Sequence, residues 1–294
     1  MLEVDSLTRR YGDRTVVDDV SFAVRPGRLT GFVGSNGAGK TTTMRMIMGI
    51  LAPTSGRVLW QGEPLEEPTR RRFGYMPEER GLYPTMRLLD QLVFFARLHG
   101  IHTDEATRRA RDLLDHFGLD DRRDDKLEQL SLGNQQRVQI AVALLHEPPA
   151  LILDEPFSGL DPLAVDSMVE LLGQRTGNEV PVLFSSHQLE LVERLCDDLV
   201  ILKDGRVAAS GSTAQLRGQG PIRYRVAVDA PDVGWIHDLP GLTVRETAGA
   251  VALVDLHETT DPADVLDELQ RKGRVVEFAR VIEPLAHVFR EVVR

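Results

Sequence analysis

The 294-residue sequence contains a single cysteine, Cys196. One cysteine can form neither an intramolecular disulfide nor a cysteine-based metal cluster. It lies in the amphipathic segment LVERLCDDL, where we expect a small buried side chain instead of a reactive thiol. This cysteine usage is consistent with a reducing, cytosolic compartment.

Long apolar runs and an excess of basic charge are also lacking. The longest apolar stretches, such as residues 140–145, fall far below the ~18–20 residues that span a bilayer, and the N-terminus has no apolar signal-peptide core. Basic residues number 35 against 45 acidic ones, and the net charge of −10 argues against a protein that coats nucleic acid. We therefore expect a soluble chain with no nucleic-acid partner, so that any membrane-spanning helices belong to other chains.

What the chain does contain is an alternation of strand and helix patterns over its first 214 residues. Strand patterns with turns fill residues 1–33, and three segments with helical spacing lie between residues 85 and 145. Strand patterns return at residues 150–156 and 180–187, with a helical segment between them. This alternation predicts an α/β domain with a mostly parallel sheet covered on both faces.

The rest of the chain shows a different pattern. Residues 215–221 have the composition of a linker, and residues 222–294 show the order β-α-β-β-α-β followed by a last helix at 285–293. This order predicts a small α+β domain of the ferredoxin-like kind. We therefore place one domain at 1–214, the linker at 215–221 and an accessory domain at 222–294.

A glycine-rich segment, GSNGAGKT at residues 34–41, matches the pattern G-x-x-x-x-G-K-[ST] in full. Its glycines let successive backbone N–H groups turn toward a phosphate, and the helix predicted over residues 41–51 adds its positive N-terminal end. Lys40 is placed to reach the β- and γ-phosphates, and the Thr41 hydroxyl to bind Mg²⁺. The expected ATP-binding residues of this segment are Gly34, Ser35, Asn36, Gly37, Ala38, Gly39, Lys40, Thr41 and Thr42.

Two acids follow an apolar strand pattern in LILDEP, residues 151–156. A buried strand rarely ends in two acids for structural reasons alone. We expect Asp154 to hold the hydration shell of Mg²⁺, and Glu155 to orient or deprotonate the attacking water. His187 ends the next strand pattern, VLFSSH, and is a candidate contact for the γ-phosphate. Lys40, Glu155 and His187 are therefore the candidate catalytic residues.

Over residues 1 to about 212 these motifs resemble the nucleotide-binding subunits of ATP-binding cassette (ABC) transporters. The resemblance implies a P-loop NTPase (RecA-like) core with an N-terminal antiparallel β subdomain and an inserted helical subdomain at about 85–145. LSLGN at 130–134 is similar to the family signature LSGGQ, which contacts the γ-phosphate bound by a partner chain. It implies nucleotide contacts from Ser131, Gly133 and Asn134, although Leu132 and Asn134 depart from the common pattern.

Two further positions take their expected roles from the same resemblance. Tyr11 stands where the family stacks an aromatic ring on adenine, and an ordinary strand aromatic is an equal alternative. Asp161 lies in SGLD, the segment that crosses the family's dimer interface. The dipeptide Asp161-Pro162 is equally compatible with a helix cap.

PEERGLYP, residues 77–84, contains the clearest departure from the family pattern. The family places glutamine after this proline, where it reaches Mg²⁺ and contacts the membrane subunit, whereas this chain has Glu78. A carboxylate binds Mg²⁺ at least as well, so we expect metal ligands from Thr41, Asp154 and Glu78. PEERGLYP and the C-terminal domain resemble the branch that exports drugs and sodium. In the family, a short helix of the membrane partner docks in a groove of the helical subdomain beside this loop. Phe94 could line that groove, but the helical spacing favours a core position.

The resemblance implies an ATPase that uses ATP and Mg²⁺, dimerises with a second ATP-binding subunit, expected to be identical, and drives integral-membrane permease subunits. It implies a place at the cytoplasmic face of the cell membrane and the export of a drug, ion or other small molecule. Two alternatives stay open. One is a soluble ABC-type ATPase acting on ribosomes or DNA, and the other is an ATP-responsive regulatory module. We interpret the C-terminal domain as a dimerising or regulatory addition.

Overall fold

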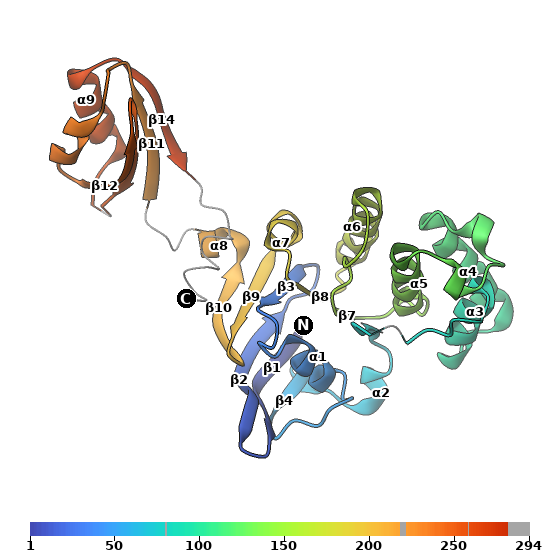
Figure 1. The fold of residues 1–294 in the computed structure, drawn as a ribbon. Coiled ribbons are helices and arrows are strands. Elements are labelled where there is room, and N and C mark those ends of the chain that lie inside the picture. The colour runs from blue at the N-terminus through green and yellow to red at the C-terminus, as the bar shows by residue number, and fades with distance from the viewer. Residues whose placement is uncertain (80, 218–221, 258, 282–294) are drawn as a thin grey trace. The chain divides into compact units, whose positions relative to one another are not determined.

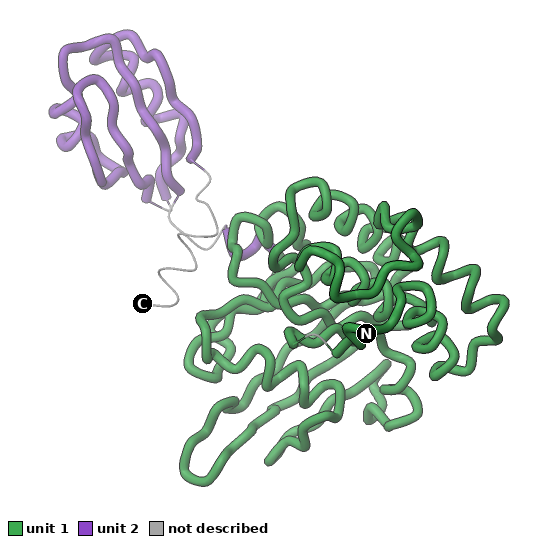
Figure 2. Tube along the Cα trace, turned by 45° about the vertical axis from the view of Figure 1, so that its right-hand side comes forward, with its two compact units in different colours: residues 1–212, 293 green, residues 213–292, 294 purple. Residues whose placement is uncertain are grey.

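The computed structural model describes residues 1–79, 81–217, 222–257 and 259–281. Within these ranges the chain forms two compact units, residues 1–212 and the part that begins at residue 213 (Figure 2). Each unit buries its own cluster of apolar side chains. None of the described helices is long and apolar enough to cross a membrane.

The first unit contains an antiparallel sheet (Figure 1). Its strands, in the order β2-β1-β4-β5, are β1 (Leu2–Tyr11), β2 (Arg14–Val24), β4 (Ser55–Trp60) and β5 (Glu63–Pro64). Alternation along β1 buries Leu2 and Val4, as expected for a strand with one face on the core. An irregularity in the pairing near Ser6, whose φ is 52°, shifts the phase so that Leu7 is also buried.

The second sheet of this unit carries the predicted site. Its strands, in the order β10-β9-β3-β8-β7-β6, are β3 (Leu29–Gly34), β6 (Gly74–Met76), β7 (Leu151–Leu153), β8 (Val182–Ser186), β9 (Asp198–Lys203) and β10 (Arg206–Ser212). All neighbours are parallel except β9 and β10, which form a hairpin around Asp204-Gly205. Every residue of β3, β7 and β8 is buried, so these strands read as unbroken apolar runs. Parallel strands end at one edge, which brings the ends of β3, β7 and β8 together.

Four helices belong to this α/β core: α1 (Lys40–Ile47), α2 (Glu67–Arg70), α6 (Pro162–Gly177) and α7 (Leu189–Leu195). Helix α1 packs on β1, β2 and β3 and buries Met44 and Ile47. It is shorter than the predicted helix over 41–51, because the chain turns at Gly49, whose φ is 68°. The N–H of Ile50 bonds back to the carbonyl of Arg45 at 2.9 Å, which closes the helix end.

The helical block predicted between residues 85 and 145 forms three packed helices, α3 (Leu88–Leu98), α4 (Thr103–His116) and α5 (Leu132–Leu144), with the 3₁₀ turns η1 (Asp120–Arg122) and η2 (Leu127–Gln129). The preference for Phe94 in the core was wrong, because its side chain is 37% exposed. The buried face of α3 is formed instead by residues that include Leu88, Leu92 and Ala96. Cys196, in contrast, is buried as expected, and burial raises the pKa of its thiol.

The second unit begins with the short helix α8 (Thr213–Arg217). It continues through β11 (Ile222–Val228), η3 (Gly234–Asp238), β12 (Leu242–Ala248), β13 (Val251–Leu256), α9 (Pro262–Lys272) and β14 (Val275–Val281). The antiparallel order β12-β13-β11-β14 is that of the predicted ferredoxin-like domain. Val226, Val254 and Leu269 contribute to its core. The helix predicted at 285–293 lies outside the described residues.

Candidate functional site

The glycine segment forms a loop between β3 and α1, with Ser35, Asn36 and Gly37 exposed. Its shape needs glycine at two kinds of position. Gly37 and Gly39 have φ values of 83° and 103°, which residues with a Cβ rarely adopt. Gly34 has no room for a side chain, because an added Cβ would lie 2.7 Å from the carbonyl oxygen of Leu202. The loop therefore curls with its backbone groups accessible, as an anion site requires.

Lys40 begins α1 and lies against the loop. Its ammonium donates to the carbonyl oxygens of Gly34 at 2.8 Å and Ser35 at 3.3 Å, and only 8% of the residue is exposed. Thr41 and Thr42 follow in the first turn of the helix and are half-buried. A positive charge, a hydroxyl and a helix N-terminus thus meet at the loop, which is the arrangement that a phosphate group favours.

Asp154, at the carboxyl end of β7, has no exposed surface. Its backbone N–H donates to the carbonyl of Met76 at 2.8 Å, and its Oδ1 accepts a hydrogen bond from Ser185 at 2.5 Å. Its Oδ2 is buried without a partner among the described residues. Burial, with the negative charge of Asp154 as a second cause, raises the pKa of Tyr75.

The residues near Asp154 fit a magnesium ion. A buried carboxylate oxygen without a hydrogen bond is costly unless a cation occupies its free side. The Thr41 hydroxyl donates to Glu78 at 3.4 Å, so a second carboxylate and a hydroxyl also lie together at the loop. Carboxylate and hydroxyl oxygens are the hard ligands that Mg²⁺ takes beside water and phosphate.

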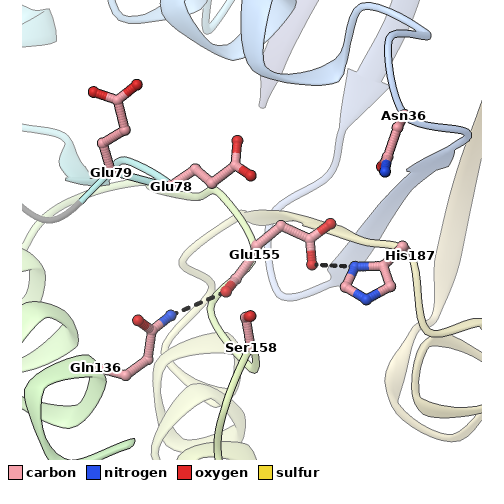
Figure 3. A pocket seen from close by; sticks show the side chains of 7 residues that line it. All are labelled: Asn36, Glu78, Glu79, Gln136, Glu155, Ser158 and His187. Carbon is pink, nitrogen blue, oxygen red and sulfur yellow. Dashed lines mark hydrogen bonds and ion pairs between the residues drawn. The ribbon is translucent and has the colours of Figure 1, made fainter. Parts of the chain in front are cut away.

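Glu155 is the next residue along the chain, and it is held in an uncommon conformation. Its φ is 51°, and its carboxylate Oε2 lies 2.9 Å from Nδ1 of His187, at the end of β8. Figure 3 shows the Glu155 carboxylate directed toward this imidazole. The carboxylate is 15% exposed and the imidazole 56%, so the pair lies at the pocket wall with the histidine toward solvent. The position of Glu155 at the pocket wall would let its carboxylate contact a water molecule in the pocket.

Glu155 and His187 line a pocket of about 520 Å³, a size typical of small-molecule sites. Its lining residues are Asn36, Glu78, Glu79, Gln136, Glu155, Ser158 and His187. The glycine loop, the acid-bearing strand end and the strand end of His187 all contribute to it. Glu78 and Glu79 approach from the other side of the pocket in Figure 3, and both are exposed.

The predicted signature residues lie at the start of α5. Ser131 is its N-cap and accepts a hydrogen bond from the N–H of Asn134 at 3.4 Å. Ser131 and Leu132 are exposed, and neither they nor Gly133 and Asn134 are among the lining residues of the pocket. Gly133 packs so closely that an added Cβ would lie 2.9 Å from the carbonyl oxygen of Gly159. The structure therefore presents this segment outward, away from the pocket of its own chain.

The two positions with open alternatives also have clear local partners. Asp161 caps α6, since its carboxylate accepts the N–H of Ala164 at 2.8 Å, and it also pairs with Arg137 at 3.3 Å. Tyr11 ends β1 with 49% of its surface exposed, and the guanidinium of Arg9 lies 4.5 Å from its ring centre. The capping interpretation of Asp161 thus has direct geometry, while the stacking role of Tyr11 stays a prediction.

Sequence reasoning missed three residues around the acid pair. Ser185 bonds to Asp154 and to the N–H of Glu155, and Gln136 donates to the Glu155 carbonyl at 3.0 Å. Ser158 lines the pocket. A sequence signal existed only for Ser185, which lies two residues before His187 in the strand pattern VLFSSH and therefore on the same face.

The comparisons with known proteins agree with this geometry. Residues 17–158 match the ABC transporter family, and residues 211–293 match the C-terminal domain of DrrA1-3-like ATP-binding proteins. The ABC transporter ATP-binding protein YhaQ of Bacillus subtilis is 40% identical over 98% of this chain and 96% of its own length. The Nod factor export ATP-binding protein I of Paraburkholderia xenovorans is 37% identical over 73% of this chain and 72% of its own.

A solved structure shows the same fold. An ATP-binding subunit of an ABC transporter is 39% identical, with a TM-score of 0.69, over 74% of this chain and 92% of its own. The P-loop core, the antiparallel β subdomain and the helical subdomain expected from the sequence are therefore confirmed. The chain belongs to the ABC transporter family, as an ATP-binding subunit with ATPase activity.

Proposed function

We propose that this subunit drives the export of a small molecule through membrane-spanning partner chains, by closing in pairs around two ATP molecules. The observation that carries the proposal is the split arrangement of the site. Asn36 of the glycine loop, Glu155 and His187 line one pocket, whereas Ser131 and Gly133 are not among its lining residues and Ser131 is exposed. A second copy of the chain would complete the site with its Ser131 and Gly133.

The exposed start of α5 is suited to that role. A helix N-terminus carries unpaired N–H groups and partial positive charge, which favour a phosphate. Gly133 packs against the loop of Ser158 and Gly159, so the α5 start and that loop form one surface. Each ATP would then lie between Lys40 and Thr41 of one chain and Ser131 and Gly133 of the other.

Hydrolysis at this site requires an activated water in line with the γ-phosphate. Glu155 accepts the proton or orients the water, and His187 fixes the direction of its carboxylate through the 2.9 Å contact. Lys40 supplies positive charge at the phosphates. Thr41, Asp154 and Glu78 would hold Mg²⁺, which when bound neutralises the developing phosphate charge.

An exposed aromatic cluster beside the pocket loop suits a helix of the membrane partner. Tyr83 is 49%, Phe94 37% and Leu98 67% exposed. The rings of Tyr83 and Phe94 touch edge to face with centroids 5.9 Å apart, so they form a continuous apolar surface. An exposed apolar patch of this kind is typical of a protein interface. Binding there would place the subunit at the cytoplasmic face of the cell membrane.

The direction of transport is proposed from the relatives. One relative is a Nod factor export ATP-binding protein, and the C-terminal domain matches that of DrrA1-3-like proteins. The name of the Nod factor relative supports export. The two names leave the cargo as a drug, ion or other small molecule.

Replacing Glu155 by Gln tests the proposed base. The variant keeps the side-chain shape but cannot accept a proton, so ATP should still bind while turnover falls by roughly 10²–10⁴-fold. Phosphate release and ATP affinity measure the two effects, and gel filtration with ATP should show a trapped dimer. Glu179→Gln is the matched control, because Glu179 also has a positive φ, of 61°, and is exposed outside the pocket. Normal hydrolysis by Glu155→Gln would refute the assignment.

Co-purification tests the partner. The tagged subunit should bring down a polytopic membrane protein, and Phe94→Ala combined with Leu98→Ala should reduce its recovery while leaving the ATPase rate of the isolated subunit unchanged. Recovery of ribosomes or DNA instead would contradict the transport proposal.

A further inference from the structure

The main chain of Glu155 adopts a conformation that needs external support. Its φ of 51° lies in the left-handed region, which a residue with a long side chain seldom occupies. Such a conformation persists only where neighbouring groups hold it. The contacts on the Glu155 backbone therefore decide where its carboxylate lies.

Two side chains from other elements hold that backbone. Ser185 on β8 accepts the N–H of Glu155 at 2.8 Å, and Gln136 on α5 donates to its carbonyl oxygen at 3.0 Å. Gln136 divides its amide between this carbonyl and that of Pro156, at 3.2 Å. The Ser185 oxygen accepts one N–H of this turn, that of Glu155. Ser185 therefore restrains Glu155 more directly than Gln136 does.

Ser185 also bonds to the other acid of the pair. Its hydroxyl donates to Oδ1 of Asp154 at 2.5 Å, and the residue has no exposed surface. A hydroxyl has one proton, and the Glu155 N–H already supplies a donor, so the proton of Ser185 is committed to Asp154. This bond occupies Oδ1 and leaves Oδ2, which is buried without a partner among the described residues, as the free metal-binding oxygen.

We propose that Ser185 is a positioning residue that fixes the metal-binding carboxylate of Asp154 and the base Glu155 relative to each other. The inference rests on the proposed roles of these two acids. One buried hydroxyl, 2.5 Å from the Asp154 carboxylate and 2.8 Å from the Glu155 nitrogen, makes their geometry a single unit. Residues that orient a metal ligand commonly affect metal affinity as strongly as activity.

Ser185→Ala tests this assignment, because it removes both hydrogen bonds and adds no volume. We expect kcat to fall by about 10–100-fold, and the KM for ATP to change far less because the glycine loop binds the phosphates. The dissociation constant of Mn²⁺, a spectroscopic probe for the Mg²⁺ site, should rise by about the same factor. It is measured by electron paramagnetic resonance with a nonhydrolysable ATP analogue bound.

Other variants separate positioning from folding. Thr30→Val removes a hydroxyl from β3, the neighbour of β8; Thr30 is fully buried, and its hydroxyl has no partner in the described part of the chain. It should leave kcat and Mn²⁺ affinity unchanged. Ser185→Thr keeps the hydroxyl and should restore most of both values. Ser185→Cys replaces it by a weak donor and should give intermediate losses, which keeps the test valid if the alanine variant does not fold.

The outcomes are distinguishable. A folded Ser185→Ala or Ser185→Cys protein with unchanged Mn²⁺ affinity and kcat overturns the inference, even where Glu155→Gln is inactive as proposed. Loss of thermal stability with normal Mn²⁺ affinity also overturns it, since that result marks a purely structural residue. Normal turnover in Glu155→Gln contradicts the proposed function itself.

Discussion

Single side chains set the charge of the pocket, and among its lining residues Glu78 departs from the family pattern. Its carboxylate lies 3.4 Å from the Thr41 hydroxyl, and Figure 3 shows its side chain between those of Glu79 and Glu155. A carboxylate binds Mg²⁺ more strongly than an amide oxygen but brings a negative charge toward the phosphates. Its position should therefore depend on the metal.

Glu78→Gln tests this dependence. The variant should need several-fold more Mg²⁺ for half-maximal ATPase activity, because a neutral oxygen replaces a charged ligand. Glu79→Gln is the control: the Glu79 side chain is 90% exposed and its carboxylate lies 3.8 Å from Arg45, so the Mg²⁺ requirement of this variant should stay near that of the parent. Equal Mg²⁺ titrations for Glu78→Gln and the parent would contradict the assigned ligand.

His146 is a second residue whose environment has a measurable consequence. Its Nε2 lies 3.1 Å from the carbonyl oxygen of Arg72, so Nε2 carries the proton, and its ring stacks on His99 at 3.7 Å. Burial, with the charges of His99 and Arg109 as further causes, lowers the pKa of His146 to about 4. Its Nδ1 is buried without a partner among the described residues, which also disfavours a second proton.

The low pKa predicts an acid-sensitive stability. An unfolded histidine titrates at 6.5 and the folded His146 at about 4, so between these values the unfolded chain binds more protons. The free energy of unfolding should fall as the pH is lowered through this window, by roughly 1–2 kcal/mol from this residue between pH 7 and 5. His146→Gln keeps the donor to Arg72 and should remove this part of the slope in denaturant titrations. An unchanged slope would contradict the prediction.

At the scale of elements, helix starts connect the site to the rest of the fold. Ser131 is the N-cap of α5 and Asp161 is the N-cap of α6. Both of these predicted nucleotide-contact residues therefore also cap the first turn of a helix. Asp161 additionally pairs with Arg137 on α5, which links the start of α6 to α5. A change at either cap therefore affects local structure as well as any contact with a partner.

Two Asp161 variants separate these effects. Asp161→Ala should lower the free energy of unfolding by about 1 kcal/mol, because the N–H of Ala164 loses its acceptor. Asp161→Asn keeps the cap oxygen and should cost little, while it removes the charge that pairs with Arg137. Denaturant unfolding measures the stability, and ATP-dependent dimerisation measures the contact. Equal stability losses in both variants would contradict the capping assignment.

At the scale of the whole molecule, the predicted site belongs to one of the two units. Every predicted site residue lies within residues 1–212, and the second unit has a core of its own. Removing residues 213–294 should therefore leave ATP affinity unchanged but weaken self-association, on the order of tenfold or more if the second unit contributes a dimer contact. Sedimentation of the truncated and full-length chains with ATP measures this difference. Identical self-association, ATPase rate and transport coupling would contradict a dimerising or regulatory role.

The local patterns of the sequence determined much of this protein. GSNGAGKT predicted a loop between a strand and a helix, and the βαββαβ order predicted the ferredoxin-like unit; both are confirmed. Phosphate binding by the loop stays a prediction. These predictions depend on residues adjacent in sequence, where glycine conformations and hydrophobic periodicity act directly. The overextended helix over 41–51 shows the limit of periodicity, because apolar spacing continued past the glycine that ends the helix.

Only the tertiary structure decided how distant residues meet. Nothing in VLFSSH states that the Ser185 hydroxyl contacts both Asp154 and Glu155, or that Gln136 reaches the Glu155 carbonyl across 19 positions of chain. Likewise, the spacing of LVFFARL favours burial, yet Phe94 is exposed because α4 and α5 pack on the other face of α3. The physical reason is the same in each case: sequence fixes which groups must be satisfied, whereas the packing of strands and helices selects the partner.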